Sequence, residues 1–260
     1  MSAAGKPSER PAMVLVNGLA EQEQTWFANV RCWREHFEVH LPELTAATGA
    51  CGTSRGPRPF SIDHLVAGLR EYIDRNVGRR VHLVANSMGG KVAIEFAVRS
   101  LEMVNRMVLL APSGLTRQER LPILAGMRVA DSDALVKSVF HAPEQAPEHL
   151  FQHYRQRLHD RTYRRNLLEV VRHTAEHRVR EILCLVRQPT LVILGASDRI
   201  VDPIESAKVA HRLPRGRIKI LRNCGHAPQI ERADTVNRLV GGFLLSPHAV
   251  RANRPVGSLN

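Results

Sequence analysis

"HLVANSMGGKVAIEF", residues 82–96, places a serine between an apolar run typical of a strand and an apolar pattern typical of a helix. The run 81–85 predicts a short buried strand, and the residues after the two glycines repeat with helical spacing. Ser87 then lies in the turn, where the small residues Ala85 and Gly89 let the chain close sharply. This arrangement predicts a nucleophile elbow, in which the hydroxyl stands at the carboxyl edge of a sheet. The alternative is an ordinary turn in which the serine caps the helix.

The rest of the chain alternates between strand and helix patterns. Apolar stripes at 61–76, with Ser61 as N-cap, and at 233–245 predict amphipathic helices. Short apolar runs predict strands at 12–16, 37–41, 81–85, 106–111, 190–194 and 217–221. Such alternation predicts an α/β fold with a doubly wound, mostly parallel sheet of about six strands.

One long stretch interrupts this alternation. Residues 117–187 contain no clear strand and are rich in Arg, His, Gln and Glu, with apolar residues at helical spacing. We interpret them as a helical cap inserted into a core formed by 11–116 and 188–245. The polar ends, 1–10 and 246–260, are expected to be flexible tails.

The composition limits the class of protein. Of the 260 residues, 43% are apolar and 24% are charged, as in soluble globular proteins. No apolar run is long enough to span a membrane, and the start lacks a signal-peptide pattern, so we expect a cytoplasmic location. The four cysteines form no C-x-x-C pair and are expected to be free thiols. Neither a metal nor another cofactor is expected.

The chain is strongly basic, with a formal net charge of +12. Of its 37 basic residues only five are lysines. A basic surface can attract nucleic acid. The arginines are spread along the chain, however, with no basic block and no helix-turn-helix, RNA-recognition or zinc-finger pattern. We therefore expect a small-molecule substrate and no nucleic-acid partner, and the sequence leaves the oligomeric state open.

A nucleophilic serine needs a base to accept its proton and a carboxylate to orient that base. The loop after the predicted strand 190–194 carries Asp198, and the loop after 217–221 carries His226. Both loops leave the carboxyl edge of the predicted sheet, where Ser87 also lies. A second carboxylate, Asp202, shares the first loop; it precedes a proline and is interpreted as a helix cap.

The same chemistry needs backbone donors for a developing oxyanion. The N–H of Met88 follows the serine directly, at the start of a helix. A second donor is expected in "LVNGLAEQ", residues 15–22, where Gly18 permits a tight turn and the N–H of Leu19 can point into the site.

Several segments together resemble the α/β-hydrolase superfamily, over about residues 12 to 245. They are "VLVNGLAEQEQTW", "HLVANSMGG", "VLLAPSGL", "PTLVILGASDRIVDP" and "CGHAPQIERADTVNRLVGGFL". The chain is also similar to a bacterial subgroup of this superfamily whose substrates are unknown. The resemblance implies Ser87 as nucleophile, His226 as general base and then acid, and Asp198 as its orienting partner. It also implies Leu19 and Met88 as oxyanion donors and 117–187 as a cap over the site.

The chain departs from the superfamily pattern at several points. Asn17 stands where a histidine is common, before the Gly18 that supports the oxyanion loop. Ala85 replaces the first glycine of G-x-S-x-G, whereas Gly89 keeps the second. Two leading strands of the full superfamily sheet are expected to be missing.

Other patterns have simpler interpretations. "HTAEH", residues 173–177, spells a zinc-binding H-x-x-E-H pattern, but no third ligand is evident, and we interpret it as part of a solvated helix. Ser113 follows a strand without a base at comparable spacing and is expected in a turn or cap. Trp26 and Trp33 are expected in the core.

The sequence therefore predicts a serine hydrolase that cleaves an ester or a similar acyl bond. Three alternatives stay open: the same residues used for thioester, amide or C–C hydrolysis, or for a lyase or perhydrolase reaction; a ligand receptor with little or no turnover; and a nucleic-acid-binding protein.

Overall fold

The computed structural model describes residues 10–19, 23–44, 60–119 and 132–247. Most of the two predicted tails, 1–9 and 248–260, lies outside these described residues, as do 120–131 of the predicted cap.

A six-stranded parallel sheet forms the centre of the molecule, with the strand order β2-β1-β3-β4-β5-β6. Its strands are β1 (Ala12–Val16), β2 (Glu38–His40), β3 (Val81–Asn86), β4 (Val104–Leu110), β5 (Thr190–Gly195) and β6 (Gly216–Leu221). The sequence prediction of a doubly wound sheet of about six strands is confirmed. β4 begins two residues earlier than predicted, because Val104 pairs with Val81 at the start of β3.

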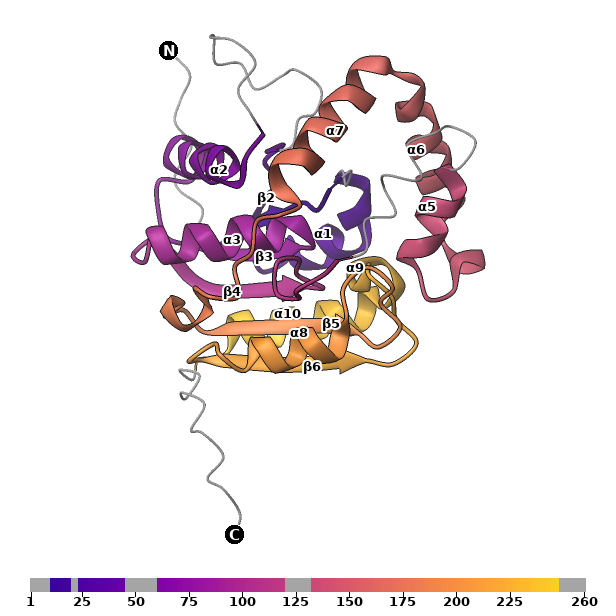
Figure 1. Cartoon of the computed structure of the whole chain (residues 1–260). Coiled ribbons are helices and arrows are strands. Elements are labelled where there is room, and N and C mark those ends of the chain that lie inside the picture. Colours follow the sequence, from indigo (N-terminus) through magenta and orange to yellow (C-terminus); the bar gives the residue numbers. More distant parts are fainter. Residues whose placement is uncertain (1–9, 20–22, 45–59, 120–131, 248–260) are drawn as a thin grey trace.

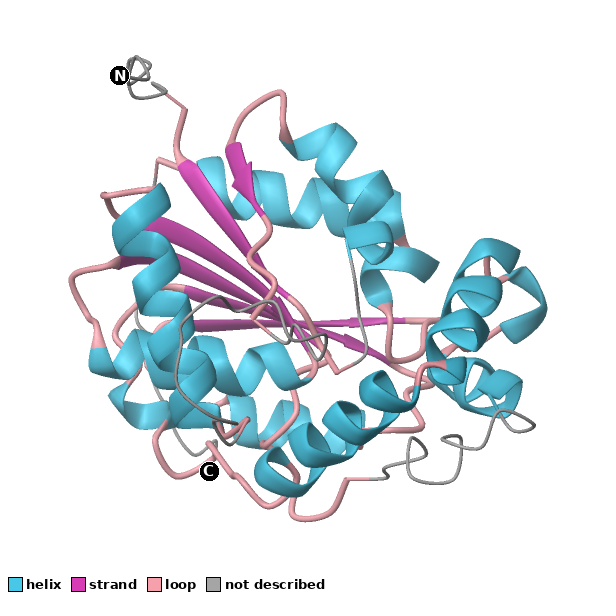
Figure 2. Ribbon diagram, turned by 90° about the horizontal axis from the view of Figure 1, so that it is seen from above, coloured by secondary structure: helices cyan, strands magenta, loops and turns pink. Residues whose placement is uncertain are grey.

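Helices cover both faces of this sheet (Figures 1 and 2). The sheet is flanked by η1 (Glu23–Trp26), α1 (Phe27–Trp33), α2 (Ile62–Asn76), α3 (Met88–Arg99), α8 (Pro203–Ala210), α9 (Pro228–Glu231) and α10 (Ala233–Leu245), where η denotes a 3-10 helix. The two helices predicted from apolar stripes, α2 and α10, are present, and Ser61 caps α2 by accepting a hydrogen bond from the His64 N–H.

Alternate residues of each central strand enter opposite layers of the core. In β1, Ala12, Val14 and Val16 pack with α2 and α3, whereas Met13 and Leu15 pack with α1 and α10. A strand buried on both faces must be apolar throughout, which explains the continuous apolar runs in the sequence. The sheet therefore forms a rigid platform, and its loops position the polar groups described below.

The two tryptophans belong to this core, as expected. Trp26 and Trp33 are almost completely buried, and their ring centroids lie 6.3 Å apart. The indole N–H of Trp26 donates a 2.7 Å hydrogen bond to Asn17 Oδ1. That bond ties the loop after β1 to η1.

The described part of the 117–187 stretch is helical and contains no strand. Its elements are α5 (Ser132–Val139), η3 (Pro143–Gln145), α6 (Glu148–His159), α7 (Arg161–Thr174) and η4 (Leu183–Leu185). These elements are inserted in the chain between β4 and β5. Figure 1 shows that α5, α6 and α7 project away from the sheet. Tyr154, Leu158, Tyr163, Leu167 and Val171 hold α6 and α7 together in a separate apolar cluster.

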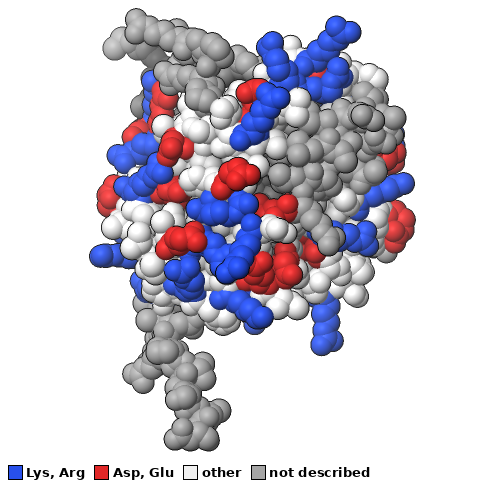
Figure 3. Space-filling model, viewed as in Figure 1, with Lys and Arg blue, Asp and Glu red and all other residues white. Residues whose placement is uncertain are grey.

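Over the face in Figure 3, basic and acidic side chains are interspersed. Several arginines of the described residues form ion pairs with neighbouring carboxylates; examples are Arg70 with Asp74 at 2.8 Å and Arg99 with Glu95 at 2.8 Å. In such a pair the positive charge of the arginine is balanced locally by a carboxylate.

Within the described ranges, no helix is long and apolar enough to cross a membrane. Three of the four cysteines, Cys32, Cys184 and Cys224, are described and are free thiols.

Candidate active site

Ser87 occupies a sharp turn between β3 and α3. Its backbone has φ 49° and ψ −120°, an unusual conformation for a residue other than glycine. Such strain persists only where the surrounding structure imposes it, and it is common at active sites. The Ser87 side chain makes no capping hydrogen bond to α3, so the interpretation as a helix cap is wrong. The helix also begins at Met88, earlier than predicted, because the chain turns within a single residue.

The small residues beside Ser87 allow the turn to contact β1. A Cβ atom added at Gly89 would lie 2.3 Å from the carbonyl oxygen of Val16 and 2.6 Å from that of Asn17. Neither backbone oxygen can move far, because one belongs to β1 and the other to the loop directly after it. A glycine is therefore required here for close packing.

The loops after β5 and β6 bring two further predicted residues to Ser87. The Nε2 atom of His226 lies 2.8 Å from Ser87 Oγ, and its Nδ1 atom lies 2.8 Å from Asp198 Oδ2. The three side chains come from the carboxyl ends of β3, β5 and β6. They form one continuous hydrogen-bonded relay, with Asp198 completely buried at its end.

The two carboxylates of the loop after β5, Asp198 and Asp202, have different partners in the structure. Besides contacting His226, Asp198 accepts hydrogen bonds through Oδ1 from the N–H groups of Ile200 and Val201, at 2.8 and 3.0 Å. These bonds fix the carboxylate, so that its other oxygen faces the imidazole. Asp202 instead caps α8 by accepting bonds from the first N–H groups of that helix, as predicted.

Glu231, which the sequence analysis missed, holds the loop that carries His226. Its carboxylate accepts hydrogen bonds from the N–H of Gly225, at 2.6 Å, and from the N–H of His141, at 2.7 Å. Burial raises the pKa of this carboxyl, and the N–H donors oppose that rise. The N–H of His226 in turn donates to the carbonyl of Val139, at 2.7 Å. The residues that follow α5 are thus bound directly to the histidine loop.

Ser113 lies in a turn after β4, as expected, but its contact with Ser87 was not predicted. Its Oγ lies 3.4 Å from Ser87 Oγ, and its N–H donates to the carbonyl of Ser87 at 3.0 Å. Ser113 is buried, and it restrains the strained turn from the β4 side. The only signal in the sequence was its place in the loop that follows a predicted strand.

Of the two predicted oxyanion residues, Met88 directly follows Ser87. Met88 begins α3, so its N–H belongs to the first turn, whose donors have no partner within the helix. Leu19, in the loop after Gly18, packs against both the sheet core and the α6–α7 cluster. The side chain of Asn17 accepts the Trp26 bond, so this loop is held by an indole donor.

Cys224 is adjacent to the site but is not equipped to act as its nucleophile. Burial raises the pKa of its thiol to about 12, and Glu231 contributes to the rise. A thiol of that pKa holds almost no thiolate near neutral pH, and the thiolate is the reactive form.

The "HTAEH" histidines point to different partners. His173 lies 3.5 Å from Glu169 in the same helix, whereas His177 Nε2 lies 2.7 Å from Glu95 of α3. Among the residues that the structure describes, no three His, Cys, Asp or Glu side chains form a group that could hold a metal.

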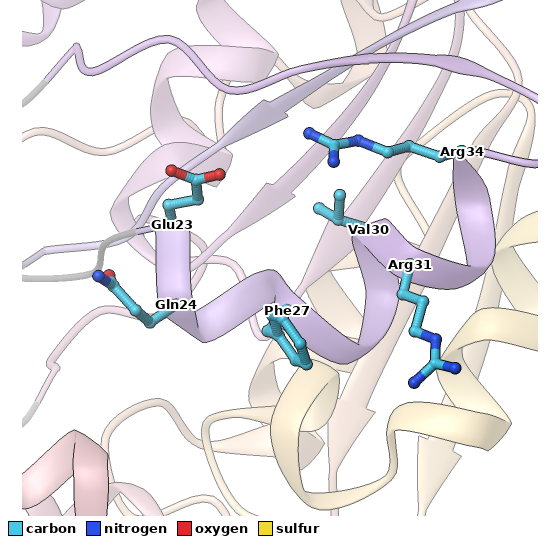
Figure 4. Close-up of a pocket in the computed structure, with 6 residues that line it drawn as sticks. All are labelled: Glu23, Gln24, Phe27, Val30, Arg31 and Arg34. Atoms are coloured by element: carbon cyan, nitrogen blue, oxygen red, sulfur yellow. The ribbon is translucent and has the colours of Figure 1, made fainter.

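A surface pocket lies away from this site, on η1 and α1 (Figure 4). Its lining includes the exposed ring of Phe27, with Glu23 on one side and Arg34 on the other. None of these side chains belongs to the relay.

A parallel sheet that carries Ser, His and Asp at its carboxyl edge defines the α/β class of hydrolytic folds. The chain belongs to the alpha/beta hydrolase family, whose model matches residues 13–239. It is therefore assigned to the hydrolases of this fold.

Similar proteins include monoacylglycerol lipases and a dienoate hydrolase. The chain is 24% identical to the human monoacylglycerol lipase ABHD6, over 96% of this chain and 80% of that protein. It is 30% identical to a 2-hydroxy-6-oxo-6-phenylhexa-2,4-dienoate hydrolase of Comamonas testosteroni, over 64% of this chain and 63% of that protein.

Solved structures share the architecture. A meta-cleavage product hydrolase from Pseudomonas fluorescens superposes with a TM-score of 0.80 at 21% identity, over 92% of both chains. An enol-lactonase from Burkholderia xenovorans superposes with a TM-score of 0.77 at 21% identity, over 92% of this chain and 93% of that one. At this level of identity the likeness establishes a common fold.

Proposed function

We propose that this protein is a serine hydrolase that cleaves a carboxylic ester or a similar acyl bond of a small molecule through an acyl-enzyme. The observation that supports this most strongly is the relay from Ser87 through His226 to Asp198, with 2.8 Å at each contact of the imidazole. We further propose that α5, α6 and α7 belong to a cap over this relay. A cytoplasmic location and the absence of a nucleic-acid partner stay predictions of the sequence.

In the first half-reaction, Ser87 Oγ attacks the acyl carbon while His226 Nε2 takes its proton. The C–O bond then breaks, and the departing alkoxide receives that proton from Nε2. In the second half-reaction, water attacks the acyl-enzyme, again with His226 as base, and Ser87 is released with its proton restored. Throughout, Asp198 accepts the Nδ1 hydrogen bond and stabilises the imidazolium.

Each tetrahedral intermediate carries a negative oxygen that needs donors. We assign these donors to the backbone N–H groups of Met88 and Leu19. Gly89 supports this arrangement, because its missing side chain lets the turn approach the backbone of Val16 and Asn17. The Asn17–Trp26 bond limits the movement of the loop after β1.

A second candidate reaction, hydrolysis of a C–C bond, follows from the Comamonas relative, which is named for a substrate of that kind. An ester panel and a vinylogous 1,5-diketone, assayed side by side, distinguish the two. Turnover of the esters alone supports the primary proposal, and preferential turnover of the diketone supports the second.

The direct test is intact mass after treatment with a fluorophosphonate, followed by a burst assay with p-nitrophenyl esters. We expect one adduct for the wild type and none for Ser87→Ala. Ser113→Ala is the matched control, because it removes the neighbouring hydroxyl and leaves the relay intact. Full labelling of Ser87→Ala, or a label that depends on Ser113, rejects the assignment. A labelled protein without turnover of any substrate favours the receptor alternative.

A further inference from the structure

One side of α6 carries three buried polar atoms. They are Nε2 of His153, the hydroxyl oxygen of Tyr154 and Nε of Arg157, and none has a hydrogen-bond partner among the residues that the structure describes. Tyr154 itself is only 8% exposed. Buried polar atoms are nearly always paired, because an unpaired one loses its bonds to water without compensation. Three such atoms within one helical turn indicate a place where a ligand supplies the missing partner.

The electrostatic character of this side of α6 is positive. Arg157 forms no ion pair with any described carboxylate, and its guanidinium stacks 4.7 Å from the ring centroid of Tyr163. Arg155, two residues earlier, is paired at 2.6 Å with both oxygens of Asp133. Arg157 is therefore a positioned cation whose charge is available, whereas the charge of Arg155 is compensated.

The neighbouring groups can act as donors. Burial raises the pKa of Tyr154, so its hydroxyl keeps its proton over the physiological range. Burial, then Arg157, then His149 lower the pKa of His153, so its imidazole is neutral and has one N–H to donate. A guanidinium and two neutral donors, with no acid among them, suit an anion that presents more than one oxygen.

Packing contacts connect the part of α6 around Tyr154 with the loop after β1. Tyr154 belongs to the apolar cluster of α6 and α7, against which Leu19 of the β1 loop packs. The far end of α7 is fixed at Thr174, whose carbonyl accepts a bond from Lys91, one turn after Ser87. From Tyr163 to Thr174 the helix extends roughly 16 Å. Arg157 stacks on Tyr163, so the polar group lies at the end of α7 opposite to the Lys91 contact.

We propose that Tyr154 and Arg157, assisted by His153, bind a carboxylate at the end of the substrate remote from the cleaved acyl bond. This inference rests on the proposed function and names its substrate class: esters whose acyl chain ends in a carboxylate. Arg157 and Tyr154 are specificity residues, because they touch the substrate and take no part in the bond-breaking steps.

The test compares p-nitrophenyl monoesters of α,ω-dicarboxylic acids with their methyl-capped, neutral counterparts at several chain lengths. Arg157→Gln should lower kcat/KM for a long acidic ester roughly 10- to 100-fold, mainly through KM, because a hydrogen bond to a charged group is lost. Tyr154→Phe should cause a smaller loss in the same direction. Neither variant should change the neutral esters more than about twofold.

Two matched variants make the result specific. Arg155→Gln removes a paired arginine from the same helix and should leave both ester series unchanged. Arg157→Lys keeps the charge and should restore part of the acidic activity. Equal losses for acidic and neutral esters, or equal effects of Arg155→Gln and Arg157→Gln, overturn the inference.

Binding without turnover separates this inference from the proposed function. Sebacate, a dicarboxylate that the enzyme cannot hydrolyse, should raise the Tm of the wild type and not that of Arg157→Gln. If no ester is cleaved and this shift is present, the anion site stands and the function fails. If neutral esters are cleaved and sebacate has the same effect on both proteins, the function stands and the anion site is rejected.

Discussion

The ammonium group of Lys91 donates a 2.9 Å hydrogen bond to the main-chain carbonyl of Thr174, which joins α3 to the end of α7. The same ammonium lies 3.6 Å from Glu119, and both side chains are buried. Burial lowers the pKa of Lys91, while Glu119 opposes this change. The helix that begins beside Ser87 is therefore tied to the start of the inserted stretch, at Glu119, and to the end of α7, at Thr174.

Lys91→Met should destabilise the protein by about 3 kcal/mol or more, because it leaves the Glu119 carboxylate buried without its cation. The free energy of unfolding from urea titration measures the loss. Arg70→Met is the control: it removes an exposed pair with Asp74, and a much smaller loss is expected because solvent screens such a pair. Adding Glu119→Gln to Lys91→Met should recover part of the loss. A cost no larger than that of Arg70→Met would show that the buried pair is unimportant.

Asp198→Asn should reduce kcat by roughly 10³- to 10⁴-fold, the effect of losing the carboxylate that orients a catalytic histidine. Asp202→Asn should leave kcat nearly unchanged, because asparagine also caps helices and Asp202 does not touch the imidazole. Ester turnover under saturating substrate distinguishes the two. Similar losses from both variants would mean that the wrong carboxylate has been assigned.

Glu231→Ala should lower kcat/KM roughly 10- to 100-fold without removing any group that touches the substrate, since small displacements of a catalytic group are costly. Gln at this position keeps an oxygen acceptor for one of the two N–H groups and should restore part of the activity. Fluorophosphonate labelling rates provide a second measurement. Equal effects of Ala and Gln, with an unchanged labelling rate, argue against a positioning role.

The stability of the fold should depend on pH through His82. Burial, then Arg106 and Arg80, lower the pKa of this histidine to about 4 from 6.5. Between these pH values the unfolded chain binds more protons than the folded one, so stability falls as the pH falls from 6.5 towards 4. The loss is about 3 kcal/mol at its largest. His82→Phe should reduce this dependence, and urea titrations across the window measure it; an unchanged slope in the variant rejects the prediction.

The local patterns of the sequence were sufficient for the fold and for the members of the relay. Short, largely apolar runs predicted the strands, and β1, β3 and β5 are buried throughout because a strand covered on both faces has no polar side. Ser87 between small residues predicted a sharp turn, and the loops after two later strands predicted Asp198 and His226. Asp202 before a proline predicted a helix cap. All of these inferences depend on spacing within a short segment, which the covalent chain fixes directly.

Contacts between distant segments were beyond the reach of such patterns. Lys91 and Thr174 are 83 positions apart, and nothing near either residue specifies the other. Glu231 holds the histidine loop by accepting hydrogen bonds from the N–H groups of two separate segments. In the sequence it cannot be told apart from any other acidic residue on a helix. Arg155 and Arg157 are likewise indistinguishable as letters. Only the packing of α6 against its neighbours decides which one meets a carboxylate and which keeps its charge, because pairing depends on where the helix faces in space.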